Sequence, residues 1–231
     1  MGNSTDPKFI AFGDSHAVVL GSGADALGVD YLAWALFAGH ELDRDFFVVE
    51  ADELIVNSKR GQAVFCRRTD GGQSVPGSAP HLPILSTAGF NANNFGKKFH
   101  HGGLSITRSS NGQFVSSACF ESVVSGARTH VLQFYRALIG LGWSVFAAPS
   151  PPRFDPKWAS VAHEFQNILA HQLTAVGVKI VDVRAETTDP DGMLRQKFAG
   201  SDDRLHGNAK YGALVVRRFM EMIDAHPVAS G

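Results

Sequence analysis

Cysteine is scarce in this chain, and long apolar runs are missing. Cys66 and Cys119 are the only two cysteines, which is too few for a disulfide framework, and neither has the spacing of a structural zinc site. We expect both to be reduced. No stretch approaches the roughly 18 apolar residues of a membrane span. The first residues, MGNSTDPKF, lack the apolar segment of a secretory signal. These absences predict a cytoplasmic protein without a membrane span.

The chain also lacks an excess of positive or negative charge. The formal net charge is −1, and without runs of like charges we expect neither a nucleic-acid partner nor a membrane-surface partner. His40, His163 and His171 show no ligand-like spacing with carboxylates or with each other, so we predict no metal. Gly21-Ser22-Gly23 lacks the rest of a dinucleotide fingerprint or phosphate-binding loop. We expect the protein to need no cofactor.

The rest of the sequence fits one globular domain over residues 1–231. A hydrophobic fraction of 44% over this length can fill one core. Short apolar runs alternate with longer helical stretches, which favours a parallel sheet covered by helices on both faces. The runs expected as five core strands are residues 8–13, 31–38, 82–87, 144–148 and 178–183, of which the second could instead be a buried helix. The expected helices are residues 17–27, 125–141, 156–176 and 208–225.

Three segments interrupt this alternation. Residues 46–69 read as two strands joined by a reverse turn, a β-hairpin insertion beside the main sheet. Residues 70–80 are a loop rich in Gly, Pro and Ser. Residues 100–117 are polar and poorly periodic, and we expect a Gly-rich loop in which His100 and His101 either contact substrate or form a solvated pair. The segments 46–69 and 100–115 are the ones that could shape a site.

Polar residues follow three expected strands, and together they suit acyl transfer. Ligands in such sheets bind at the carboxyl ends of strands. Ser15 follows the first strand, Asn91 follows the third, and Asp203 and His206 follow the fifth. A serine hydroxyl becomes a nucleophile when a histidine takes its proton and a carboxylate fixes the imidazole tautomer. The three-residue spacing lets Asp203 reach one ring nitrogen of His206 while the other faces Ser15.

The remaining residues near these strand ends have weaker assignments. The backbone N–H of Ser15 and the side-chain amide of Asn91 are candidate oxyanion donors. Asp202 is an alternative to Asp203 for the acid role. The three-residue spacing to His206 favours Asp203. We expect Asp14 to hold the turn under Ser15. His16 could line the site or simply start the following helix.

At these positions the chain resembles the SGNH (GDSL-like) hydrolase superfamily. The first block of that family is carried by Gly13-Asp14-Ser15, with His16 where many members have Leu. Its third block, Gly-x-Asn, is Gly89-Phe90-Asn91, followed by Ala92 where Asp is often found. Its last block, Asp-x-x-His, is Asp203-x-x-His206. The blocks span nearly the whole chain, and the resemblance implies a flavodoxin-like three-layer α/β/α fold with a five-stranded, mainly parallel sheet.

The second block of the family is a glycine whose N–H joins the oxyanion hole. Gly39 in FAGHE is one candidate, and Gly21 and Gly23 are the alternatives. The resemblance thus implies catalytic residues Ser15, Asp203 and His206, with an oxyanion hole of Ser15, Gly39 and Asn91.

The activity implied is that of a serine esterase acting on O-acyl esters of a small molecule or carbohydrate. Without a wide apolar lid segment, a small acyl group is favoured over a long-chain lipid.

An acyltransferase with the same triad and a non-catalytic glycan-binding member are the alternatives. The G-x-S-x-G elbow of α/β-hydrolases does not surround Ser15. A flavodoxin-like binding module with phosphate-contacting turns would leave Asp203 and His206 unexplained. Oligomeric state is not encoded in these motifs.

Overall fold

The computed structural model describes residues 6–67, 82–108, 112–201 and 205–225, and a five-stranded sheet forms its centre. The strand order is β10-β9-β6-β1-β2, and every neighbouring pair is parallel. The strands are β1 (Phe9–Gly13), β2 (Tyr31–Ala35), β6 (Ile84–Ser86), β9 (Val145–Ala147) and β10 (Lys179–Ile180). Taken in chain order, this is the flavodoxin-like order 2-1-3-4-5. The prediction of a five-stranded parallel sheet is confirmed, and the second apolar run is a strand.

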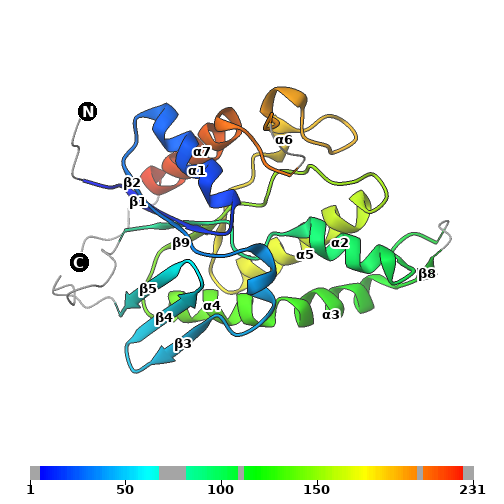
Figure 1. Cartoon of the computed structure of the whole chain (residues 1–231), viewed down its shortest axis with the longest axis horizontal. Coiled ribbons are helices and arrows are strands. Elements are labelled where there is room, and N and C mark those ends of the chain that lie inside the picture. The colour runs from blue at the N-terminus through cyan, green and yellow to red at the C-terminus, as the bar shows by residue number, and fades with distance from the viewer. Residues whose placement is uncertain (1–5, 68–81, 109–111, 202–204, 226–231) are drawn as a thin grey trace.

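Helices cover both faces of this sheet (Figure 1). Side chains of a strand alternate between the two faces, and every residue of β1 is buried. Phe9 and Ala11 belong to one apolar cluster together with side chains of α1 and α7. Ile10 and Phe12 belong to a second cluster with side chains of α4 and α5. The chain therefore forms three layers, as expected.

The helices match those predicted from the sequence near the two ends of the chain and differ from them in its middle. They are α1 (His16–Leu27), α2 (Ala92–His101), α3 (Ser117–Ala127), α4 (Thr129–Gly140), α5 (Ala159–Ala175), α6 (Arg184–Thr187) and α7 (Ala209–Ala225), with the 3₁₀ turns η1 (Gly39–Asp43) and η2 (Gln196–Phe198). The single helix expected over 125–141 is instead two helices that meet at Arg128. Its backbone has φ −119° and ψ 17°, outside the helical region. Its guanidinium is buried and donates to the carbonyl oxygen of Gly89.

The helix α2 was not expected, because its sequence, ANNFGKKFHH, is mostly polar. Two features stabilise it. Asn91 caps its N-terminus, accepting from the backbone N–H of Asn94 at 3.5 Å. Phe95 and Phe99 lie one turn apart and both pack against the ring of Phe120 on α3. His100 and His101 are therefore in the last turn of α2, and their expected placement in a loop was wrong.

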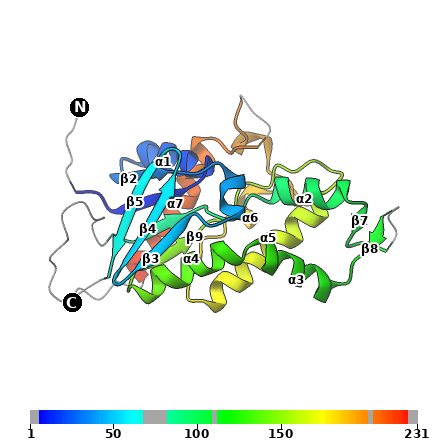
Figure 2. The same ribbon diagram turned by 60° about the horizontal axis from the view of Figure 1, so that its bottom comes forward.

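The insertion at 46–69 has three strands, not two. β3 (Phe47–Glu50), β4 (Glu53–Ser58) and β5 (Gly61–Cys66) form an antiparallel sheet of their own, drawn in cyan in Figure 2. The chain turns between β3 and β4 at Ala51, whose φ is 51°. Reading VVEADELIV as one strand missed this turn. The buried side chains of β4 and β5 join the core cluster on the α4 and α5 side of the main sheet.

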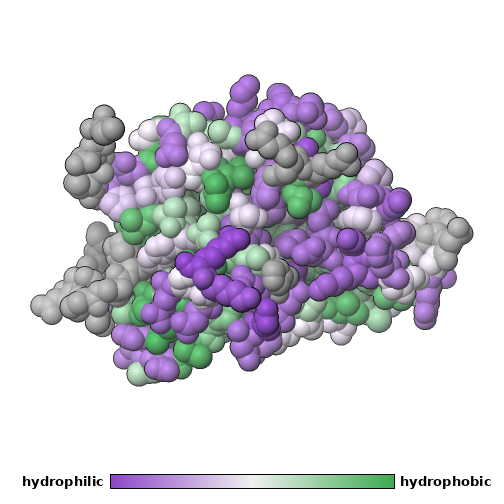
Figure 3. All heavy atoms as spheres, viewed as in Figure 1, coloured by the Kyte–Doolittle hydropathy of each residue, from purple (hydrophilic) through white to green (hydrophobic). Residues whose placement is uncertain are grey.

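The rest of the described chain adds little further regular structure. β7 (Leu104–Ser105) and β8 (Gln113–Phe114) form a short parallel pair at the end of the molecule opposite β3–β5 (Figures 1 and 2). Hydrophilic residues cover most of the face shown in Figure 3. Among the described residues, no helix combines the length and the apolar character that crossing a bilayer requires. The loop expected at 70–80 lies outside those residues.

Candidate active site

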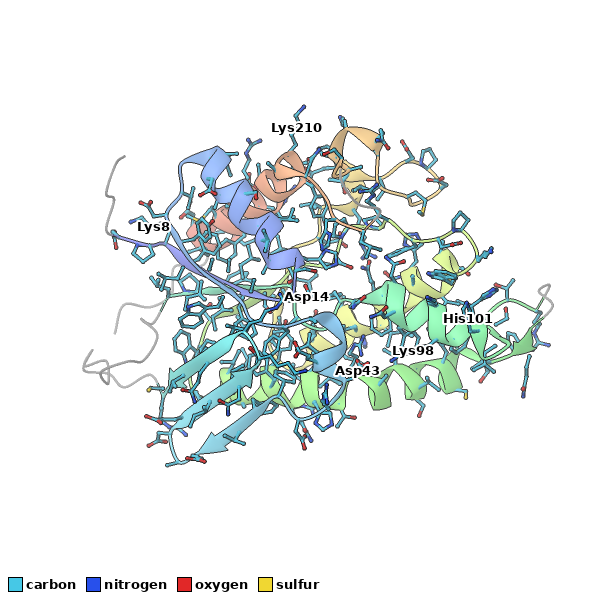
Figure 4. The ribbon with its side chains drawn as sticks, viewed as in Figure 1. Lys8, Asp14, Asp43, Lys98, His101 and Lys210 are labelled. Carbon is cyan, nitrogen blue, oxygen red and sulfur yellow. The ribbon has the colours of Figure 1, made fainter. Side chains whose placement is uncertain are left out.

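Those predicted site residues that the structure describes lie around the topological switch point of the sheet. β2 and β6 flank β1 on opposite sides, and ligands in such folds bind where the strand order reverses. Ser15 follows β1 and Asn91 follows β6, while His206 precedes α7. Figure 4 labels Asp14 at the end of β1, where the strand runs into α1. The sheet thus brings together residues from both ends of the chain.

Ser15 and His206 are in hydrogen-bond contact. The Oγ of Ser15 lies 2.9 Å from the Nε2 of His206, within the range required of a nucleophile and its base. Ser15 also stands at the N-cap position of α1, yet among the described residues its side chain makes no capping bond to that helix. The hydroxyl is therefore directed at the imidazole and not at the backbone of α1.

A buried hydrogen-bond network fixes the turn beneath Ser15. Asp14 is 1% exposed, and its Oδ1 accepts from the backbone N–H of His16 at 3.0 Å and from the Thr87 hydroxyl at 3.1 Å. Gly13 has φ 146°, and an added Cβ there would overlap the Thr87 hydroxyl. β1 and β6 are thus locked together at their ends, and Asp14 has the structural role predicted for it.

The segment that carries His206 is held from two sides. The Nη1 of Arg153 donates to the carbonyl oxygen of His206 at 2.9 Å and to that of Gly200 at 3.1 Å. Asn208 caps α7 by accepting from the backbone N–H groups of Lys210 and Tyr211. His206 is therefore held through its own carbonyl oxygen and lies directly before the capped start of α7. Sequence reasoning did not identify Arg153, because its partners are backbone carbonyls that leave no motif.

The structure separates the three candidate glycines of the second block. Gly39 starts η1, and an added Cβ there would overlap the side-chain amide of Asn91. Gly21 instead faces the ring of Tyr31, and Gly23 packs against the backbone of Gly212 on α7. Of the three, Gly39 is the one that lies beside Asn91.

The orientation of Asn91 suits a donor role. Its Oδ1 accepts from the backbone of α2, so the Nδ2 group is the end of the amide that meets Gly39. An amide nitrogen carries two N–H donors. The side chain therefore caps α2 through its oxygen and leaves its nitrogen beside Gly39.

The other candidate residues have mixed outcomes. The ring of His16 lies 4.6 Å from that of His206, so it borders the candidate base as well as starting α1. His100 and His101 face the indole of Trp158, at 5.9 Å and 6.4 Å between ring centroids. Asp202 and Asp203 lie outside the described residues, so the orienting carboxylate stays a prediction. Within the described chain, no group of three or more His, Cys, Asp or Glu side chains could hold a metal ion.

Two hollows are lined in part by residues at the start of α2. The first, which we call the η1 hollow, has a volume of about 280 Å³ and is lined by Gly39 and Asn91 together with Phe95 and Phe99 of α2. The second, which we call the Trp158 hollow, has a volume of about 480 Å³. Its lining includes Arg153, which donates to the carbonyl oxygen of His206, and Leu205, which directly precedes His206 in the chain.

A charged cluster that no sequence motif predicts lines part of the η1 hollow. Arg128, whose side chain is 4% exposed, lies 2.6 Å from Asp43, and Lys98 lies 3.2 Å from the same carboxylate. Figure 4 shows Asp43 on η1 beside Lys98 on α2. Burial lowers the pKa of the Arg128 guanidinium, and the neighbouring Asp43 opposes that shift. This cluster ties η1 to the junction of α3 and α4.

The likenesses found among solved structures are distant. No protein-family model and no curated protein matches the chain. It is similar to the crystal structure of a lipase/acylhydrolase from Enterococcus faecalis, with 14% identity, a TM-score of 0.46, and coverage of 95% of this chain and 96% of that one. It is also similar to the crystal structure of an acetyl xylan esterase, with 14% identity, a TM-score of 0.47, and coverage of 93% and 98%. The case for a function therefore depends on the residues of the site.

Proposed function

We propose that this chain is a serine ester hydrolase of the SGNH type. The observation that carries the proposal is the 2.9 Å contact between the Oγ of Ser15 and the Nε2 of His206. It lies at the switch point of the sheet, with Gly39 and Asn91 side by side in the loops after the two strands that flank β1. A nucleophile, its base and a pair of oxyanion donors are the parts that acyl transfer requires.

In the proposed mechanism Ser15 attacks the ester carbonyl carbon. His206 accepts the hydroxyl proton at Nε2 and then donates it to the leaving alcohol, which departs and leaves Ser15 acylated. Water then attacks the acyl-enzyme with His206 again as base, and the acid is released. The N–H groups of Ser15 and Gly39 and the side-chain amide of Asn91 stabilise the oxyanion, and Asp203 holds His206 in the required tautomer. The proposed reaction uses no cofactor.

The acyl group is proposed to be small, as the sequence suggested. The test is hydrolysis of p-nitrophenyl esters from acetate to octanoate by the wild type, Ser15→Ala and the control Ser22→Ala. Ser22 is exposed on α1 and bonds only within that helix in the described structure. We expect Ser15→Ala to lose about 10³-fold or more in kcat, Ser22→Ala to match the wild type, and acetate to be preferred. Equal activity in Ser15→Ala and the wild type would contradict Ser15 as nucleophile.

A transferase would use the same residues with a sugar hydroxyl in place of water. The two reactions are separated by repeating the acetate assay with added methyl glucoside and measuring acetate on the sugar against free acetate. Free acetate as the main product supports hydrolysis, and acetylated glucoside as the main product supports transfer. A wild type without any Ser15-dependent turnover would support the non-catalytic, glycan-binding alternative.

A further inference from the structure

The two hollows are lined by different parts of the candidate site. The histidine that takes the serine proton later gives it to the leaving oxygen, so the alcohol part of an ester must lie on the His206 side. The η1 hollow is instead lined by Gly39 and Asn91, the proposed oxyanion donors. The Trp158 hollow is on the His206 side, since Leu205 lines it and its Arg153 donates to the carbonyl oxygen of His206.

The Trp158 hollow has a fixed aromatic wall. The indole Nε1 of Trp158 donates to the Oδ1 of Asn93 at 3.4 Å. The ring also packs on α2 at Gly96, where an added Cβ would lie 2.7 Å from the indole Cδ1. The amide of Asn93 is in turn held by the carbonyl oxygen of Arg153 at 3.0 Å. The indole is therefore held in place before any ligand arrives, which lowers the entropic cost of binding against it.

Polar groups border this aromatic wall and have hydrogen-bonding capacity left over. Asp155 accepts the backbone N–H of Lys157 through Oδ1, and a carboxylate has a second oxygen with its own lone pairs. Both carbonyl contacts of Arg153 use Nη1, and the guanidinium also carries N–H groups on Nε and Nη2. An apolar face bounded by a few oriented polar groups is the usual makeup of a small-molecule site.

We propose that the Trp158 hollow binds the alcohol part of the substrate, and that this part is a sugar ring. A pyranose has a C–H face that can lie on the indole and hydroxyls at its edge that can bond to Asp155 and Arg153. A flat aryl alcohol would use the indole but not the polar edge, and a simple alkyl alcohol would use neither. The assignment rests on the proposed function, because the position of the sugar is inferred from the proton that His206 donates to the leaving alcohol.

The test uses two esters with one acyl group and different alcohols. Acetate release from methyl 6-O-acetylglucoside and from ethyl acetate is measured with the wild type, Trp158→Ala, Trp158→Phe and Asp155→Asn. We expect Trp158→Ala to lose about tenfold in kcat/KM on the sugar ester, mostly through KM, and less than twofold on ethyl acetate. Trp158→Phe keeps an aromatic face and should retain most of the preference. Asp155→Asn keeps the acceptor for Lys157 and should lower only the sugar-ester value, by several-fold.

The control is Phe114→Ala, which removes an aromatic side chain 40% exposed on β8, and it should leave both esters unchanged. If Trp158→Ala fails to fold, Asp155→Asn tests sugar binding in the same hollow without removing the indole ring. Equal losses on the two esters, or none in both Trp158→Ala and Asp155→Asn, would overturn the sugar assignment while leaving an ester hydrolase in place. A wild type that hydrolyses neither ester in a Ser15-dependent way would remove the proposed function, and the sugar site with it.

Discussion

Gly39 and Asn91 touch so closely that residue 39 has no room for a Cβ beside the Asn91 amide. One residue starts η1 and the other caps α2, so the contact joins the loops after β2 and β6. Both residues, from different strand ends, line the η1 hollow. Oxyanion stabilisation depends on such preorganised donors, and the following variants test whether this pair provides it.

Gly39→Ala should abolish most activity without unfolding the protein. The new methyl group would displace the Asn91 amide, and losing one oxyanion donor typically lowers kcat by about 10²- to 10³-fold. Gly140→Ala is the matched control, because an added Cβ there meets open space at the end of α4. Initial rates on p-nitrophenyl acetate and thermal melting of both variants decide the matter. Normal turnover by Gly39→Ala would exclude this glycine from the site.

Asn91→Asp should separate the two roles of that side chain. Aspartate caps a helix as well as asparagine does, so α2 and the melting temperature should be preserved. The donor, however, becomes a carboxylate, which would repel the oxyanion, and we expect kcat to fall by about 10²-fold or more. Asn91→Ala should lose activity and also about 0.5–2 kcal/mol of stability through the lost cap. An active Asn91→Asp enzyme would argue that residue 91 serves α2 alone.

The acid of the proposed triad can be identified with two neighbouring variants. Asp203→Asn should lower kcat by about 10³- to 10⁴-fold, because an amide favours the wrong tautomer of His206. Asp202→Asn is the matched control and should keep nearly full activity. Steady-state kinetics above pH 7 give the comparison. If Asp202→Asn is the impaired variant, the acid sits one residue earlier than the Asp-x-x-His spacing predicts.

The parts of the site that follow buried strands could be predicted from sequence. β1 and β6 are short apolar runs that end in glycine-containing turns, so Ser15 and Asn91 were placed at strand ends without any structure. Parallel strands then bring those ends to one edge of the sheet. The expectation of three layers succeeded for the same reason, since a strand buried on both faces needs helices on both.

The parts that failed depend on contacts between distant residues. α2 is polar in sequence and is stabilised by the packing of Phe95 and Phe99 on Phe120, which no local pattern reveals. The break between α3 and α4 likewise coincides with Arg128, which is directed inward to Asp43, far away in the chain. Tertiary contacts of this kind override local propensity. The Trp158 hollow was missed because its walls come from separate loops.

His163 on α5 should make folding stability depend on pH. Its Nε2 is buried, and among the described residues it has no hydrogen-bond partner, while its ring packs edge-on against Phe154 at 4.9 Å. Burial, with a smaller effect from the nearby cation of Arg184, lowers the pKa of the imidazole. The unfolded chain therefore takes up a proton near pH 6.5, while the folded chain does so only at lower pH, and the free energy of unfolding falls as the pH drops through this window.

His163→Phe removes this titration and keeps an aromatic ring against Phe154. We expect its melting temperature relative to the wild type to rise steadily as the pH is lowered from 8 to 5, because only the wild type pays for keeping a neutral imidazole. His171→Phe, at an exposed position of the same helix, is the matched control substitution. Thermal melts at unit pH intervals measure the difference. A gap between His163→Phe and wild type that stays constant with pH would mean that the imidazole is protonated equally easily in the folded and unfolded chains.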